Sequence, residues 1–240
     1  MKKNQVYLII GGLIAAVCVI IGLVFYANSL RINVNGYDET AYIEADRNNG
    51  QIADHIKGSP DAPVIVIEYA DYQCPGCATM NPRLNSLVEE YDGQLAIIYR
   101  SYVLSYHPNG PSSALAANAA GLQGYWKEFA DLLFANQADW EYSSGHDRTE
   151  LFKTYFISAS KEQGDVDKFI SDLSSSAVRR KLNFDIALAN KIDLSGTPAL
   201  YLDGEKIDFS SAGTAEAFAD LMHGVVNSAL EAKGLEPKVK

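Results

Sequence analysis

The hydrophobic pattern begins with one long apolar stretch near the N-terminus. Residues 6–27 form a run of 22 residues without a charged side chain, and Lys2 and Lys3 precede it. As a helix this run would span about 33 Å, close to the roughly 30 Å hydrocarbon core of a bilayer. The run is long for a cleaved signal peptide, and bulky Phe25 occupies a position where cleavage needs a small residue. Residues 1–27 are therefore predicted to be an uncleaved single-pass anchor, with the rest of the chain outside the cytoplasm.

A polar, aperiodic stretch separates the apolar run from the rest of the chain. Residues 28–50 show neither a helical nor a strand period, so we expect a flexible tether there. Residues 51–240 alternate apolar runs with amphipathic stretches, which indicates one globular domain. Its first segment, residues 51–57, could form an edge strand, and the Gly- and Pro-containing residues 58–63 predict a turn.

Two short apolar runs predict buried strands that lie side by side. Residues 64–67 are β-branched throughout, and residues 95–101 form a second run of this kind. The residues between them, 78–91, suit a helix with a kink at Pro82. A strand, a helix and a strand in this order predict a βαβ unit with parallel strands.

From about residue 108 to residue 191 only helical periods occur. A block of this kind between two strand regions predicts a helical subdomain inserted into an α/β core. We expect helices over residues 112–120, 126–136, 149–159, 165–173 and 178–190, capped by Ser112 or Ser113 in the first and by Thr149 in the third.

The C-terminal part returns to the sheet. Residues 199–202 and 205–208 flank Asp203-Gly204, a pair typical of a type I′ hairpin turn. Residues 214–233 then place apolar side chains on one face and predict a closing amphipathic helix.

Composition narrows the range of functions. The net charge of −10 and the lack of a basic stripe argue against nucleic-acid binding. The chain has three cysteines, and one of them, Cys18, lies in the N-terminal apolar run. Cys74 and Cys77 are thus the only pair in the globular part. We expect His55, His146 and His223 on the surface and a turn role for His107, and no metal or other cofactor is expected.

The Cys74-Pro75-Gly76-Cys77 sequence follows the first apolar strand and begins the next helix. The thiolate is the nucleophile in disulfide exchange, and the N-terminal turn of a helix stabilises a negative charge. Pro75 fits the first helical position, where its missing N–H costs nothing. We interpret Cys74 as the attacking thiol, Cys77 as the buried resolving thiol, and Glu68 at the strand end as an acceptor for the Cys77 proton. Half of a zinc site and a structural disulfide are the two alternatives for such a pair.

These residues resemble the DsbA-like thiol–disulfide oxidoreductases of the thioredoxin superfamily, in their membrane-anchored branch. The resemblance rests on the C-P-x-C turn, on Glu68 six residues before it, on Pro82 five residues after Cys77, and on a late Thr197-Pro198 pair. It implies a thioredoxin-like α/β fold with an inserted helical subdomain, preceded by a single transmembrane helix.

The resemblance also implies how a substrate would be held. In this family the proline at the position of Pro198 is cis and packs beside the cysteine turn. The backbone of Thr197 would then pair with an extended substrate strand, next to Pro75 and Gly76. Strongly oxidising relatives often carry a histidine at the position of Gly76, so its absence predicts a less oxidising disulfide.

The expected function is a membrane-anchored, extracytoplasmic thiol–disulfide oxidoreductase that introduces disulfides into reduced exported proteins. By resemblance, a membrane redox partner of the DsbB or VKOR kind would reoxidise the cysteine pair. One alternative is a reductase or isomerase of the same fold, although an isomerase usually needs a dimer and we find no dimerisation segment. The other alternative is a non-catalytic module that binds unfolded chains.

Overall fold

The computed structural model describes residues 17, 19–20 and 32–238. The predicted anchor over residues 1–27 lies almost wholly outside these residues, and so does the start of the predicted tether. No helix within the described part of the chain is both long enough and apolar enough to span a bilayer. The chain divides into two units between Asn33 and Val34, and the sheet and its helices belong to the unit that begins at Val34.

A mixed sheet of five strands lies at the centre of this unit, in the order β1-β3-β2-β4-β5. Strands β2 (Val64–Ala70) and β3 (Leu95–Ser101) are parallel, as the βαβ pattern predicts. Strand β1 (His55–Lys57) pairs antiparallel with β3, and β4 (Ala199–Leu202) pairs antiparallel with β2. Strand β5 (Glu205–Lys206) completes the hairpin.

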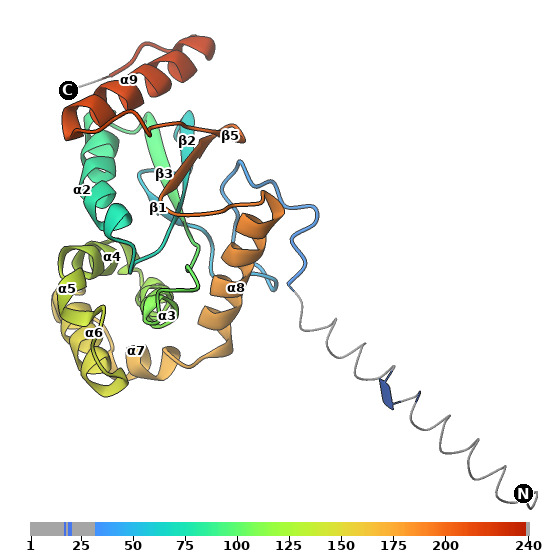
Figure 1. Ribbon diagram of the computed structural model, residues 1–240, viewed down its shortest axis with the longest axis vertical. Helices are drawn as coiled ribbons and strands as arrows, with labels where there is room; N and C mark the ends of the chain where they lie inside the picture. The colour runs from blue at the N-terminus through green and yellow to red at the C-terminus, as the bar shows by residue number, and fades with distance from the viewer. Residues whose placement is uncertain (1–16, 18, 21–31, 239–240) are drawn as a thin grey trace, which may run out of the picture. The chain divides into compact units, whose positions relative to one another are not determined.

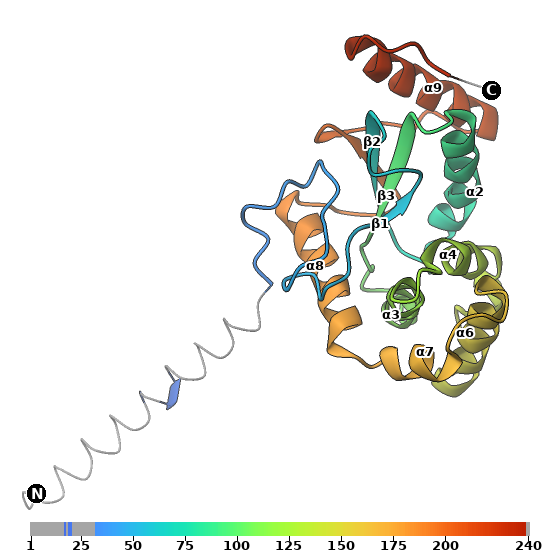
Figure 2. The ribbon, with the colours of Figure 1, turned by 180° about the vertical axis from the view of Figure 1, so that it is seen from behind.

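Helices cover both faces of the sheet (Figures 1 and 2). Helices α2 (Pro75–Glu90) and α9 (Ala215–Ala232) lie on one face, where apolar side chains of β2, α2 and α9 form one core cluster. Helix α8 (Ser176–Lys191) and residues 34–50 lie on the other face. The sheet is therefore buried on both sides, which explains why β2 and β3 are apolar almost throughout.

The predicted helical insertion is present between β3 and β4. It contains α8 and five shorter helices: α3 (Gly110–Gly121), α4 (Trp126–Ala135), α5 (Gln137–Trp140), α6 (Gly145–Ala159) and α7 (Val166–Asp172). Helix α5 was not predicted, because four residues are too few to show a helical period. Helix α6 begins earlier than predicted, because Ser144 and not Thr149 caps it by accepting a hydrogen bond from the Asp147 N–H.

The hairpin turn agrees with the prediction from sequence. Asp203 and Gly204 both have positive φ, at 50° and 84°, as a type I′ turn requires. Strand β5 is shorter than predicted, since it ends at Lys206 rather than at Asp208.

Residues 34–50 correct the expectation of a flexible tether. They pack against the domain. Two of their backbone carbonyls, those of Glu39 (2.6 Å) and Ala41 (2.8 Å), accept hydrogen bonds from the buried guanidinium group of Arg100. Hydropathy does not reveal such a segment, because backbone carbonyls and single side chains such as Tyr37, which packs on Phe184, make its contacts.

The same arginine belongs to a buried ionic cluster. Arg100 pairs with Asp54 (2.7 Å), and Lys181 of α8 pairs with both Asp54 (2.9 Å) and Asp185 (2.6 Å). All four side chains are fully buried. Two cations and two anions balance within the cluster, which joins β3, α8 and the segment before β1. Breaking one pair would leave an uncompensated buried charge.

His55 corrects a second expectation, that of a surface histidine. Its ring stacks on Trp126 of α4, with ring centroids 4.8 Å apart, and its Nε2 lies 2.7 Å from Asn118 Oδ1. Burial lowers the pKa of His55 to about 3, so the ring is neutral at pH 7. The helical insertion covers this end of β1, and the polar residues of β1 gave no sign of that cover.

Candidate active site

The two cysteines lie where the C-terminal end of β2 passes into helix α2. Cys74 is the N-cap residue of α2 with extended backbone (φ −79°, ψ 121°), and Pro75 is the first helical residue. Both thiols are free in this structure. The Cys74 residue is 7% exposed and Cys77, one turn further along, is not exposed at all. The position at the helix terminus thus presents one sulfur and hides the other.

The environment shifts the acidities of the two thiols in opposite directions. The pKa of Cys74 is lowered to about 5, first by a hydrogen bond from the Cys77 thiol and then by the Thr197 side chain and the N–H groups of Cys77 and Gly76, although burial opposes the change. Burial is the main cause that raises the pKa of Cys77 well above that of a free thiol. At pH 7 Cys74 is therefore a thiolate and Cys77 a thiol, which suits an attacking and a resolving sulfur.

The loop before β4 closes the site from the other side. The Thr197–Pro198 peptide bond is cis, and the Cys74 thiol lies 3.5 Å from the carbonyl oxygen of Thr197. A Cβ at Gly76 would lie 3.1 Å from Pro198 Cδ, so the proline ring sits directly on the cysteine turn. Pro75, Gly76, Thr197 and Pro198 are thus brought together around Cys74.

Glu68 lies beneath the cysteines in β2 and is completely buried. Neither of its carboxylate oxygens has a hydrogen-bond partner among the described residues. Burial raises the pKa of Glu68 to about 7, while the positive charge of Lys57 acts in the opposite direction. The carboxylate in turn acts electrostatically on the Cys77 thiol. A carboxyl group that titrates near neutrality beside a buried thiol can take and return a proton.

Lys57 of β1 is a residue of this site that we did not predict from the sequence. It is 1% exposed, and its ammonium group donates to Asn81 Oδ1 (2.5 Å). In a short edge strand, period-two alternation gives a lysine no sign of burial.

Asp71 and Gln73 attach two loops to the cysteine turn. The Asp71 carboxylate accepts from the Leu104 N–H (2.9 Å) and lies 2.8 Å from His107 Nδ1. The Gln73 side chain accepts from the Asn109 N–H (2.7 Å) and donates to the carbonyl of Glu141 (2.8 Å). His107 thus has the turn role that the sequence predicts, and the rim of the site is held by residues adjacent to Cys74.

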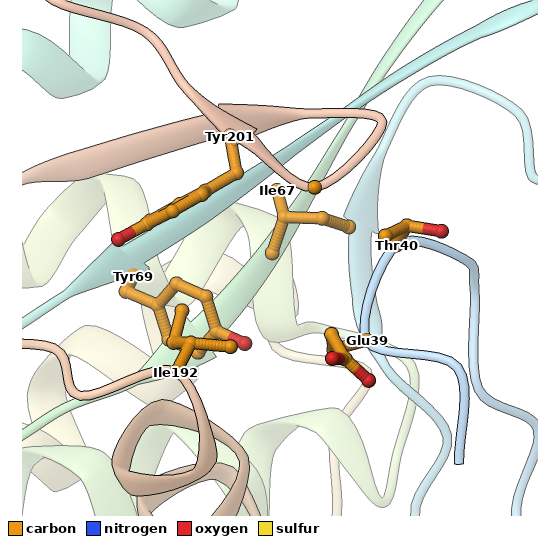
Figure 3. Close-up of a pocket in the computed structure, with 7 residues that line it drawn as sticks. Glu39, Thr40, Ile67, Tyr69, Ile192 and Tyr201 are labelled. Atoms are coloured by element: carbon orange, nitrogen blue, oxygen red, sulfur yellow. The ribbon is translucent and has the colours of Figure 1, made fainter.

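Two hollows are relevant to the site, and one of them is lined by Pro198. Pro198 and residues 206–210 line an open groove beside the cysteine turn. A separate cavity of about 70 Å³ lies on the other face of the sheet, and neither cysteine lines it (Figure 3). Its walls include Glu39, Thr40, Ile67, Tyr69, Ile192 and Tyr201.

We predict that replacing Glu68 by glutamine makes the protein more stable at high pH. The folded-state pKa of about 7 lies above the ordinary 4.5, so the carboxyl adds stability below pH 4.5 that is lost as pH rises through 7. At pH 8 the buried carboxylate therefore costs about 2–3 kcal/mol relative to pH 5. Urea unfolding of Glu68→Gln and wild type, both reduced, should diverge by that amount between pH 5 and 8. Parallel stability curves would contradict the raised pKa.

Comparison with known proteins agrees with this architecture. A family model described as thioredoxin (Thioredoxin_4) matches residues 51–221. The structure resembles BdbD from Bacillus subtilis with a TM-score of 0.61 and 18% identity, covering 81% of this chain and 100% of that one. It resembles alpha-DsbA1 from Wolbachia pipientis with a TM-score of 0.58 and 22% identity, covering 75% of this chain and 94% of that one.

Curated relatives match by sequence but are much longer proteins. The Na(+)/H(+) antiporter NhaA 1 of Mycolicibacterium gilvum is 31% identical over 156 residues, which is 64% of this chain and 24% of that protein. The antiporter NhaA 3 of Salinispora tropica is 30% identical over 172 residues, 69% of this chain and 25% of that protein. The chain thus spans about a quarter of the length of these relatives. From the match over residues 51–221 and the shared architecture, the chain belongs to this thioredoxin family and has the fold of the DsbA-like thiol–disulfide oxidoreductases.

Proposed function

We propose that this protein is a thiol–disulfide oxidoreductase that introduces disulfides into exported proteins. The observation that carries the proposal is the opposite shift of two adjacent thiols: the pKa of Cys74 falls to about 5, and that of Cys77 rises. A thiolate of low pKa is a good leaving group, so a mixed disulfide between Cys74 and a substrate is readily broken by a second substrate thiolate, with Cys74 leaving.

The reaction begins with the Cys74–Cys77 disulfide. A substrate thiolate attacks the Cys74 sulfur, the bond between the two cysteines breaks, and the Cys77 sulfur leaves as a thiolate. Because Cys77 is buried, its thiolate takes a proton from protonated Glu68. A second substrate thiolate then attacks the substrate sulfur of the mixed disulfide, and Cys74 leaves as a stable thiolate. Two electrons have passed from the substrate to the protein.

Substrate binding is assigned to the residues around Cys74. An extended peptide next to Thr197 would pair with its backbone, which recognises a strand without reading its side chains. Pro75, Gly76 and Pro198 provide a surface without charge beside the reacting sulfur. The groove lined by Pro198 and residues 206–210 lies next to this surface and adds the charged residues Lys206 and Asp208.

The reduced cysteine pair must be reoxidised by an electron acceptor. We assign this role to a membrane redox partner of the DsbB or VKOR kind, which fits a chain anchored through residues 1–27 with its domain outside the cytoplasm. In this arrangement the protein works as a monomer, since one chain contains both cysteines and the surface around them.

The proposal predicts that Cys77→Ser accumulates mixed disulfides with substrates. In this variant the Cys74 thiolate can still attack a disulfide of a substrate, which releases one substrate thiolate and leaves a mixed disulfide at Cys74. Without Cys77 this complex cannot be resolved from within the protein. In cells that produce the variant, non-reducing gels should show adducts that disappear on reduction, at least about tenfold more abundant than with wild type. The matched control, Cys74→Ser with Cys77→Ser, should show none. Equal adducts in both variants would overturn the proposal.

A further inference from the structure

A chain of hydrogen bonds leads from the surface of the insertion to the buried lysine of β1. Asp131 Oδ1, on helix α4, accepts a hydrogen bond from the side-chain N–H of Asn81 on helix α2 (2.8 Å). The side-chain oxygen of Asn81, Oδ1, accepts in turn from the Lys57 ammonium group (2.5 Å). Asn85, one turn after Asn81, also donates to Asp131 Oδ1 (2.9 Å). The insertion is therefore joined to β1 through the same helix that carries the cysteines.

Burial increases along this series of hydrogen bonds, from Asp131 through Asn81 to Lys57. The Asp131 side chain is 30% exposed, whereas Asn81 is 4% and Lys57 1% exposed. The pKa of Asp131 is lowered by hydrogen bonds from Asn81 and Asn85, which outweigh the effect of its partial burial. Asp131 is thus an anion at pH 7, and the hydrogen bonds through Asn81 connect its carboxylate to the Lys57 ammonium group.

We propose that Asp131 is a positioning residue for proton transfer in the active site, because through Asn81 it holds Lys57 as a cation beside Glu68. The inference rests on the proposed function, since it concerns the proton that Cys77 takes from Glu68 when a substrate is oxidised and returns when the cysteine pair is reoxidised. It assigns a chemical role to the insertion, which otherwise only covers the end of the sheet.

The charges around Lys57 support this relay. Burial lowers the pKa of Lys57, while the negative charges of Glu68 and Asp131 raise it and Lys127 of α4 lowers it. Lys127 is a surface residue 3.1 Å from Asp131, and its side chain is 44% exposed. Removing the charge of Asp131 leaves Glu68 as the only anion that keeps Lys57 protonated.

The groups that face Glu68 are few. Lys57 is the one cation among the described residues that acts on it, and the charge of Glu68 acts on Cys77 of α2, on Tyr72 and on Tyr99 of β3. Tyr99 is the register partner of Glu68 in the sheet and is fully buried. If Lys57 becomes neutral, the negative form of Glu68 loses its only compensating charge, and Glu68 keeps its proton to higher pH.

The test follows the resolving step by itself. The reduced full-length chain with Cys18→Ala is mixed with an aromatic disulfide reagent, dithiobis-nitrobenzoate, between pH 5 and 9. Cys74 attacks first and keeps one aromatic thiol as a mixed disulfide. Cys77 then attacks Cys74 and releases the second coloured thiolate, while its proton passes to Glu68. The second phase thus reports proton loss from Cys77.

We expect Asp131→Asn to slow the second phase about three- to tenfold at pH 7 and to move its pH profile upward. The two proteins should converge at pH 9, where Glu68 is ionised in both. The first phase should not change, because it depends on Cys74. The isosteric amide keeps the hydrogen bond to Asn81, and Asn81→Leu, which removes the Lys57 acceptor, should produce the same upward shift.

Matched controls separate this role from a structural one. Asp172→Asn removes a carboxylate from a similar ion pair with Lys168 on α7 and should leave the profile unchanged. Asp131→Glu should keep the wild-type pH profile of the second phase. In a Glu68→Gln background, adding Asp131→Asn should cause no further shift of that profile. An unshifted profile in Asp131→Asn and Asn81→Leu would overturn the inference. Failure of the proposed function would look different: the oxidised protein would then transfer no disulfide to a reduced, unfolded substrate, whatever the pH profile of the second phase.

Discussion

Cys74→Ser is expected to abolish thiol–disulfide exchange, with a loss on the order of 10³-fold or more. A serine hydroxyl has no thiolate form at pH 7, and the remaining thiol of Cys77 is buried with a raised pKa. The measurement is the rate at which the oxidised protein restores disulfides to a reduced, unfolded substrate. A Cys74→Ser protein with full activity would show that another group attacks.

Alkylation of the reduced wild-type protein gives the control for this result. At pH 6, iodoacetamide should modify Cys74 rapidly, because a thiol with a pKa of about 5 is already ionised there. Cys77 should stay unmodified until the protein unfolds. A Cys18→Ala background leaves these two thiols alone in the reaction, and equal labelling of both would contradict the assignment of roles.

The sequence predicted the parts of the fold that repeat a simple period. The β-branched run of β2, the helix after Cys77 and the hairpin at Asp203-Gly204 each follow from local rules of propensity and turn geometry. The cysteine motif was also visible from the sequence, because its spacing places two sulfurs one helical turn apart. Residues that depend on a distant partner could not be found in this way.

Lys57 and Asp131 are residues of that second kind. Lys57 is buried only because helix α4, about seventy residues further along the chain, covers its face of β1. Asp131 shows an ordinary spacing of four residues from Lys127, which is typical of an exposed helical ion pair. Its bond to Asn81 follows from how the insertion packs on α2, and no local pattern records that packing.

Gly76 shows how a sequence argument can miss compensating contacts. The missing histidine between the cysteines led us to expect a thiolate with less stabilisation. The pKa of Cys74 nevertheless falls to about 5, first through the hydrogen bond from the Cys77 thiol and further through Thr197 and backbone N–H groups. Most of these donors belong to the folded cysteine turn and only Thr197 comes from the loop before β4, so the residue between the cysteines is not the only determinant of the Cys74 pKa.

The reduced protein is expected to gain stability relative to the oxidised protein as pH rises from 5 to 7. The pKa of Cys74 falls from the ordinary 9.0 to about 5 on folding, so folding stabilises the thiolate. Because folding lowers this pKa, the contribution of the Cys74 thiolate to folding stability is complete above the unfolded-state pKa of 9.0. It is lost as pH falls through the folded-state pKa of about 5. Between pH 5 and 7 the gain would be about 2 kcal/mol, and about 1–2 kcal/mol after allowance for solvent screening at the partly open sulfur.

This prediction concerns how the difference in unfolding free energy between the reduced and oxidised proteins changes with pH. The sign of that difference at a single pH does not test it. Closing a four-residue loop by a disulfide stabilises the oxidised protein by about 2 kcal/mol through the unfolded state, which nearly balances the thiolate at pH 7. Glu68 titrates in both redox forms, so its effect cancels in their difference. Urea unfolding of both forms at pH 5, 6 and 7 measures how their difference in stability changes with pH. Cys74→Ser has no thiolate to titrate at this position, so its pH dependence gives the part that Glu68 and other groups contribute. A constant difference between the two forms would indicate a structural disulfide in a binding module, because only a thiolate stabilised by the fold makes reduction more favourable as pH rises.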